Sequence, residues 1–118
     1  MIASMNKVMV MGRVESDADH RLVGDGTKGK LGFRLRTERQ WKEQTFSTVH
    51  RIVAWGSMAE QHKSLKAGAT VYVDGRLENR KYEKDGETKW ISEISAGDIQ
   101  VFGAPAASET LPEEEIPF

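Results

Sequence analysis

Aromatic and cationic side chains occur together at four places in this 118-residue chain. A flat ring offers a surface on which a nucleobase can stack, and a cation beside it can contact the neighbouring phosphate. Each stacked base contributes roughly 1–3 kcal/mol, so several such places would dominate binding to a flexible strand. The pattern therefore favours binding of a single-stranded nucleic acid without sequence preference. The four places are Arg39 near Trp41-Lys42, Arg51 near Trp55, Arg80-Lys81-Tyr82, and Lys89-Trp90.

The surroundings of the rings predict different degrees of exposure. Trp41 lies in a polar connection and Tyr82 adjoins a turn, so we expect both rings to be exposed. Trp55 and Trp90 lie in strand-like segments, and burial in the core is the alternative for both. For Trp90 the two interpretations weigh equally. We assign base stacking to these four rings.

Residues 30–37 alternate between apolar and cationic or small side chains, as a strand with one buried face does. The cations Arg34 and Arg36 point away from the apolar side chains. A solvated, ion-paired sheet face is the alternative explanation. We assign phosphate contacts to Arg36 and to Lys42, which follows Trp41. The apolar set of this strand is Leu31, Phe33 and Leu35.

The sequence carries no pattern typical of an enzyme. It has no cysteine, no HExxH motif and no nucleophile elbow. Gly24, Gly26 and Gly29 match GxGxxG, but they open onto a strand and not onto a helix, so we reject a dinucleotide site. We interpret His62 as a packed residue and His50 as the donor or acceptor of a structural hydrogen bond. We expect no catalytic residue, cofactor or metal.

The order of elements predicts an all-β chain with small α content. Five strands with one helix between the third and the fourth describe an OB-fold, a five-stranded Greek-key barrel. We expect the helix to begin with a capping box formed by Ser57 and Glu60, and to end near Gly68 as its C′ residue. Gly12 and Gly75 are expected to allow bends. The expected strands are 7–14, 30–37, 48–55, 70–82 and 88–103, with a long loop over 15–29 and a hairpin tip at Asp85-Gly86.

Composition divides the chain at residue 103. All 17 Lys and Arg precede residue 104, whereas the last 15 residues hold four glutamates, which leaves +3 on residues 1–103 and −4 on residues 104–118. We expect one domain over 1–103 and a disordered acidic tail over 104–118. A solvated surface with an inert end is the alternative. No apolar run approaches the ~20 residues of a membrane span, and no signal pattern begins the chain, so we expect a cytoplasmic protein without a membrane partner.

The last six residues predict a docking peptide. A partner could take Phe118 in an apolar pocket and bind its α-carboxylate with a cation, while the glutamates contact a basic rim. The alternative is an inert tail. The docking residues are Glu113, Glu114, Glu115, Ile116, Pro117 and Phe118.

Several motifs together resemble the bacterial single-stranded DNA-binding protein family. They are Met5-Asn6-Lys7-Val8, His50-Arg51-Ile52-Val53, Ala59-Glu60, Lys66-Ala67-Gly68, Val71-Tyr72-Val73-Asp74-Gly75, Arg80-Lys81-Tyr82 and the Glu-Glu-Glu-Ile-Pro-Phe end. The resemblance implies an OB-fold that assembles as an oligomer, usually a tetramer, with a dimer as the other possibility. It also implies that the acidic tip recruits replication, recombination and repair enzymes.

The resemblance carries residue roles with it. It implies stacking on Trp41, Trp55 and Tyr82, with Trp90 where the family often has an aromatic residue. It implies cationic contacts at Lys7, Arg51, Arg80 and Lys81. Val49 stands where an aromatic residue normally precedes the His-Arg pair, so one stacking surface is absent. The short linker of the tail is compatible with a phage, plasmid or compact bacterial source, and a bacterial source would place the protein on the nucleoid.

We therefore predict a non-catalytic single-stranded DNA-binding protein acting in DNA replication, recombination and repair. The alternatives are a primosome-like accessory OB protein that acts mainly by protein contacts, and an oligosaccharide-binding OB domain. The acidic tip argues against the first alternative. The pairing of cations with aromatic residues argues against the second.

Overall fold

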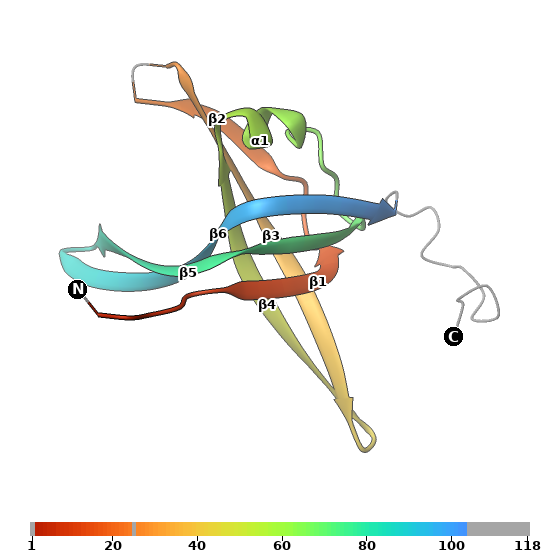
Figure 1. The fold of residues 1–118 in the computed structure, drawn as a ribbon. Coiled ribbons are helices and arrows are strands. Elements are labelled where there is room, and N and C mark those ends of the chain that lie inside the picture. Colours follow the sequence, from red (N-terminus) through yellow and green to blue (C-terminus); the bar gives the residue numbers. More distant parts are fainter. Residues whose placement is uncertain (1, 25, 104–118) are drawn as a thin grey trace.

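The computed structural model describes residues 2–24 and 26–103. The described part consists of six strands and one short helix (Figure 1). The predicted tip residues, 113–118, lie outside it, and so does the rest of the predicted tail. The elements are β1 (Val8–Val14), β2 (Asp19–Val23), β3 (Lys28–Trp41), β4 (Gln44–Trp55), α1 (Gly56–Gln61), β5 (Thr70–Lys84) and β6 (Glu87–Gly103).

Five of the strands close into a barrel. The order is β1-β5-β6-β4-β3, and a further pairing of β1 with β3 completes the ring. The contact between β4 and β6 is parallel, with Ile52 opposite Ile94, whereas the other pairings are antiparallel. The helix follows the third barrel strand and precedes the fourth. This arrangement confirms the predicted OB-fold.

Inward-facing apolar residues fill the barrel. Leu31, Phe33 and Leu35 are all buried, which confirms the predicted inner face of β3. Ala59 of α1 is completely buried against this core, so the helix covers part of the barrel. Burial of a large apolar side chain contributes about 1.5–3 kcal/mol. The largest fully buried side chains are Leu31, Leu35, Ile52, Val14, Val71 and Val73.

The predicted loop over residues 15–29 is wrong in part, because it contains β2. This strand pairs with the first part of β3, from Asp19 opposite Gly32 to Val23 opposite Lys28. Its sequence is largely polar and exposed, and two glycines follow it closely, so it resembles a loop in composition. Its backbone hydrogen bonds to β3 make it a strand all the same.

The predicted capping box is also wrong. The helix begins after Trp55, and no side chain caps it. Glu60 instead accepts a hydrogen bond from Lys63 at 2.6 Å. The helix ends at Gln61, so Gly68 is not its C′ residue, although its φ of 92° is in the left-handed region as predicted.

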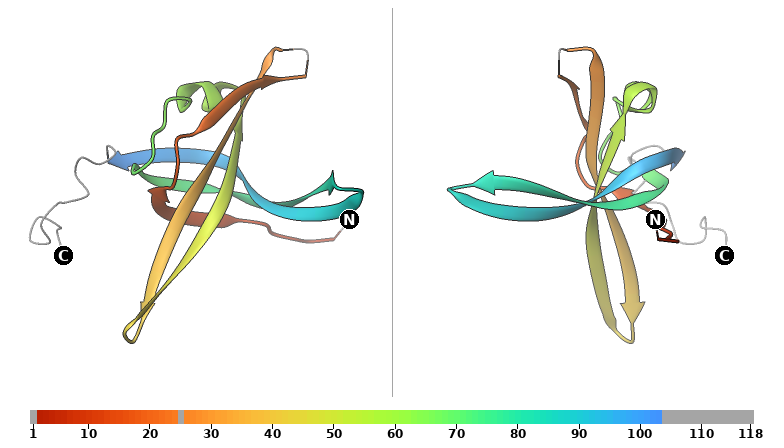
Figure 2. Two further views of the ribbon diagram at one scale, coloured as in Figure 1. Left: turned by 180° about the vertical axis from the view of Figure 1, so that it is seen from behind. Right: turned by 60° about the vertical axis from the view of Figure 1, so that its left-hand side comes forward.

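Two hairpins extend from the barrel as arms, as Figure 2 shows. The β3–β4 arm ends in a turn with Lys42 at φ 58°. The β5–β6 arm ends at Asp85 and Gly86, whose φ values of 53° and 77° fit a two-residue type I′ turn and confirm the predicted tip. Beyond the core nearly every residue of the two arms is exposed, so both faces of each arm meet solvent.

Glycine is required where two strands cross closely. A Cβ atom on Gly12 would lie 2.1 Å from the carbonyl oxygen of Arg36, and one on Gly75 would lie 2.0 Å from that of Ser95. The register shifts between Asp74 and Gly75, so this second crossing is a bulge, where the sequence predicted a bend. At Gly12 the pairing with β5 continues without a shift. There the missing side chain instead lets β1 lie close to the backbone of β3 at Arg36.

The substitution Gly75→Ala tests this crossing. The added methyl group must displace the β6 backbone, so we expect the free energy of unfolding to fall by about 1–3 kcal/mol or more. Urea unfolding followed by circular dichroism measures it. Gly97→Ala is the matched control, because its Cβ would meet nothing closer than 3.6 Å. Equal stability of the two variants would contradict the crossing as described.

Candidate nucleic-acid interface

A groove lies between the β2–β3 hairpin, β4 and the β5–β6 arm. One part of it has a volume of about 520 Å³ and is lined by Arg34 and Arg51 among others. A second part, also of about 520 Å³, adds Trp55. The two parts form one continuous surface because they share four residues. We call this surface the central groove; the shared residues are Lys30, Val53, Arg80 and Glu93.

Strand alternation places cations on the groove wall. On β3, Lys30 and Arg34 occupy the positions between the buried residues, so their side chains face outward. Arg34 lies opposite Arg51 in the β3–β4 ladder, and Lys30 lies opposite Trp55. The same register that closes the core therefore brings three cations and one ring to the same side of the barrel.

Trp55 combines an exposed ring with two cations. The residue is 40% exposed, so the alternative of a core residue is wrong. The Nζ atoms of Lys28 and Lys30 lie 4.7 Å and 5.5 Å from the ring centroid. A base stacked on this ring would have two ammonium groups near its phosphates.

Arg80 enters the groove from β5, and it is bound to Glu93. Its Nε and Nη2 atoms donate to the two carboxylate oxygens at 3.1 Å and 3.0 Å. This hydrogen bonding holds the pKa of Glu93 below its usual range, although partial burial acts in the opposite direction. Tyr82 is two residues further along β5, so it lies on the same face of the arm, nearer the tip.

Some of the predicted cations form an ion pair with a carboxylate of the protein, and others do not. Arg36 donates to Glu15 at 2.6 Å, which lowers the pKa of that carboxyl group. Arg80 is bound to Glu93 as described. Over residues 2–24 and 26–103, no carboxylate pairs with the other predicted cations, which leaves their charges open to a phosphate. These are Lys7, Lys42, Arg51 and Lys81.

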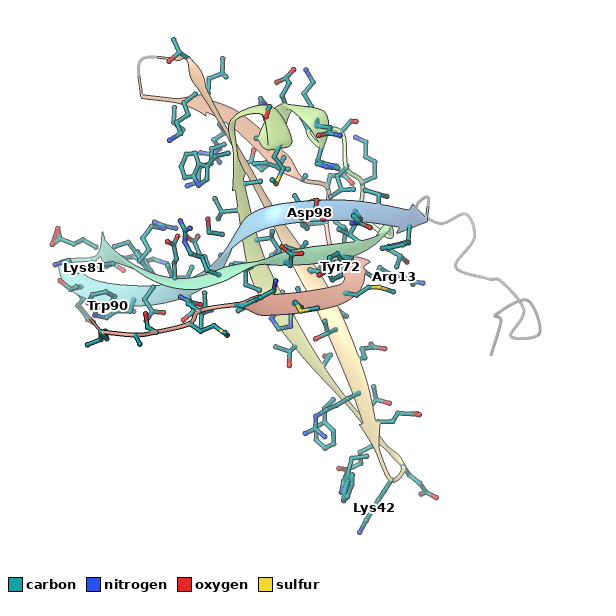
Figure 3. All side chains as sticks on the ribbon, viewed as in Figure 1. Arg13, Lys42, Tyr72, Lys81, Trp90 and Asp98 are labelled. Atoms are coloured by element: carbon teal, nitrogen blue, oxygen red, sulfur yellow. The ribbon has the colours of Figure 1, made fainter. Side chains whose placement is uncertain are left out.

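Two of the predicted rings lie away from the groove. Trp41 is 61% exposed, as predicted, but it lies at the end of the β3–β4 arm next to Lys42 (Figure 3). Trp55 is at the opposite end of that ladder, roughly 35 Å away at about 3.3 Å per residue. Trp90 is 67% exposed, so the core alternative is wrong for it as well.

Trp90 and Tyr82 lie on opposite faces of the β5–β6 arm. Tyr82 pairs with Lys89, whereas Trp90 pairs with Lys81, so alternation separates the two pairs. Figure 3 shows Trp90 and Lys81 on this arm. Lys7 precedes β1, which runs beside β5 with Val8 opposite Gly75. The structure thus brings Trp55, Arg51 and Arg80 together in the groove and places Tyr82 beyond Arg80 on the same face of the arm. It leaves Trp41, Lys42, Trp90, Lys81 and Lys7 at other places.

Sequence reasoning missed three groove cations and one ring. Arg34 already stood out from its alternation with apolar residues, but it was not assigned a contact. Lys28 and Lys30 become visible only through the register that sets them beside Trp55. Phe46 is 41% exposed on the β3–β4 arm, with the Arg39 guanidinium 4.8 Å from its centroid.

Val49 lies two residues before Arg51 on β4, where the resemblance implied that a stacking ring is absent. This side chain is 42% exposed and lies opposite Arg36. Alternation puts it on the same face of β4 as Arg51 and Trp55. An isopropyl group stands there in place of a ring, so the β4 wall offers one stacking surface, at Trp55.

His50 makes a structural hydrogen bond. His50 Nε2 lies 3.0 Å from Thr37 Oγ1, which confirms the predicted hydrogen bond.

Within the described ranges, no group of three or more His, Cys, Asp or Glu side chains is arranged to hold a metal ion. The same ranges contain no helix with the length and apolar character needed to cross a bilayer. The groove itself offers the Trp55 ring for stacking and several cations for contacts with an anion.

Comparisons with known proteins agree with this geometry. The model of the single-strand binding protein family matches residues 5–102. A single-stranded DNA-binding protein 1 of Chlorobaculum tepidum is 36% identical over 112 residues, covering 88% of this chain and 68% of that relative. One from Xylella fastidiosa is 32% identical over 110 residues, covering 86% and 80%. A Plasmodium falciparum SSB, solved in complex with ssDNA, has a TM-score of 0.77 and 29% identity, covering 87% of this chain and 99% of that one.

Proposed function

The chain belongs to the single-strand binding protein family, and from this we propose that it binds single-stranded DNA in the central groove without reading its sequence. The observation that carries the proposal is the set of unpaired cations around the exposed Trp55 ring. The structural neighbour bound to ssDNA supports the same ligand. Such a protein protects exposed strands during replication, recombination and repair, and it works where the nucleoid DNA lies, in the cytoplasm. It binds DNA and catalyses no reaction.

The groove suggests how the strand is held. One base stacks on Trp55, and phosphates on either side approach Lys30 and Arg51. The strand then continues along the β5–β6 arm to Tyr82, the next ring on that face. Trp41 and Trp90 serve strand segments that pass over the outer parts of the arms. Every cation that meets a phosphate releases condensed counterions, which makes the affinity depend on salt.

We propose further that the chain self-associates through the outer face of β1 and its neighbours, as a tetramer or a dimer. Met9 and Met11 are 62% and 57% exposed on β1, and Phe102 is 61% exposed near the end of β6. Large exposed apolar groups on one sheet face are typical of an interface.

Light scattering tests this assembly. We expect a mass of two or four times the 13.2 kDa chain, and a lower mass for Met11→Glu because a charge enters the contact. Met5→Glu is the control, since Met5 is 90% exposed outside the barrel. A wild-type mass of one chain would contradict self-association.

Substitution of Trp55 tests the DNA site. Trp55→Ala removes one stacking surface, so we expect a loss of about 1–3 kcal/mol in affinity for a labelled dT oligonucleotide, measured by anisotropy. Arg51→Ala should reduce the slope of log affinity against log salt by about 0.7. Lys63→Ala, at a residue that does not line the groove, is the control for loss of one charge. Unchanged affinity in Trp55→Ala would favour an accessory protein that acts mainly by protein contacts.

We propose that the acidic tip docks partner enzymes of replication, recombination and repair. The support is its sequence, in which Ile116, Pro117 and Phe118 follow three glutamates. Deleting these three residues should leave dT affinity intact while abolishing capture of partner enzymes by the immobilised protein. Retention of the same partners after the deletion would show that another surface recruits them.

A further inference from the structure

Glu93 places a carboxylate beside the cations Lys30, Arg51 and Arg80 of the central groove. Its side chain is only 16% exposed, and both parts of the central groove include it. Other acidic residues around the groove are engaged at its margins. Asp17 accepts a hydrogen bond from the Ala67 amide, and Asp19 pairs with Arg21 at 2.8 Å. Glu78, opposite Glu93 in the β5–β6 ladder, accepts a hydrogen bond from Arg76 at 3.0 Å. Glu93 is therefore the acidic group that meets the cations inside.

Arg80 binds Glu93 in the manner in which it would bind a phosphate. Two of its N–H groups reach the two carboxylate oxygens, at 3.1 Å and 3.0 Å. A guanidinium presents this same fork to two oxygens of a phosphate group. The arginine cannot offer that fork to DNA while Glu93 holds it.

Two further cations face the same carboxylate. Lys30 on β3 and Arg51 on β4 both help to lower the pKa of Glu93, after Arg80, so the carboxylate lies within the field of three positive charges. Neither of them pairs with a carboxylate elsewhere in the described part of the chain. Without an anion between them, the three cations would repel one another across the groove.

We propose that Glu93 occupies, in the free protein, the place of a backbone phosphate, and that incoming single-stranded DNA takes its place at Arg80. This inference rests on the proposed function and adds an exchange step to it. The carboxylate holds the three cations together in the absence of DNA. It also competes with DNA, so it weakens binding and reduces the number of counterions that binding releases.

The substitution Glu93→Gln tests the exchange, because glutamine keeps a hydrogen-bond acceptor for Arg80 but removes the charge. We expect about fivefold tighter binding of labelled dT, which corresponds to the loss of one partly exposed ion pair. The salt slope should become steeper by about 0.7, since one more cation meets DNA. Glu87→Gln is the matched control: it changes net charge equally on the same arm, where Glu87 is exposed near the tip. Its affinity should stay within about twofold of wild type.

Weaker binding by Glu93→Gln, or an effect equal to that of Glu87→Gln, would overturn the exchange and show that Glu93 only positions Arg80. Arg80→Ala provides a second comparison, since it leaves Glu93 facing Lys30 and Arg51. Adding Glu93→Gln to Arg80→Ala should recover part of the lost affinity, whereas a further loss contradicts exchange. If wild type binds dT but Glu93→Gln does not bind it more tightly, the exchange alone fails. If wild type does not bind dT, the proposed function fails with it.

Discussion

The alternation of side chains along β3 and β4 is the constraint on which both the core and the groove depend. Leu31, Leu35 and Ile52 are buried because every second residue of these strands points into the barrel. The residues between them must then point outward, and these include Lys30 and Arg51. A shift of one residue in this ladder would bury cations and expose the core. The stability of the barrel thus fixes the position of the charges that we propose as the DNA contacts.

Ion pairs within the protein decide which of these charges a ligand can use. Arg36 and Arg80 have the right charge and exposure for phosphate contacts, yet Glu15 and Glu93 hold them. Exposed ion pairs are weak, about 0–1 kcal/mol, so a polyanion can compete for such a cation. Glu93 therefore neutralises part of the positive field of the groove in this structure.

The fold was predictable from the sequence because its patterns are strong. Alternation over residues 30–37 and the Asp85-Gly86 turn indicated strands in the order of an OB-fold. The sequence did not reveal β2, whose polar residues gain their strand conformation from pairing with β3. The capping box failed because Glu60 binds Lys63 and not the helix start. Likewise, the relative placement of the predicted rings comes from strand register, which shows that Trp90 and Tyr82 face opposite ways.

The central claim is that single-stranded DNA lies in the groove beside Trp55. A crystal structure of the protein with bound dT oligonucleotide tests it most directly. The account predicts a thymine stacked on the Trp55 ring, with phosphates beside Lys30 and Arg51. DNA bound on the outer face of β1 and β5, with the groove left empty, would contradict it.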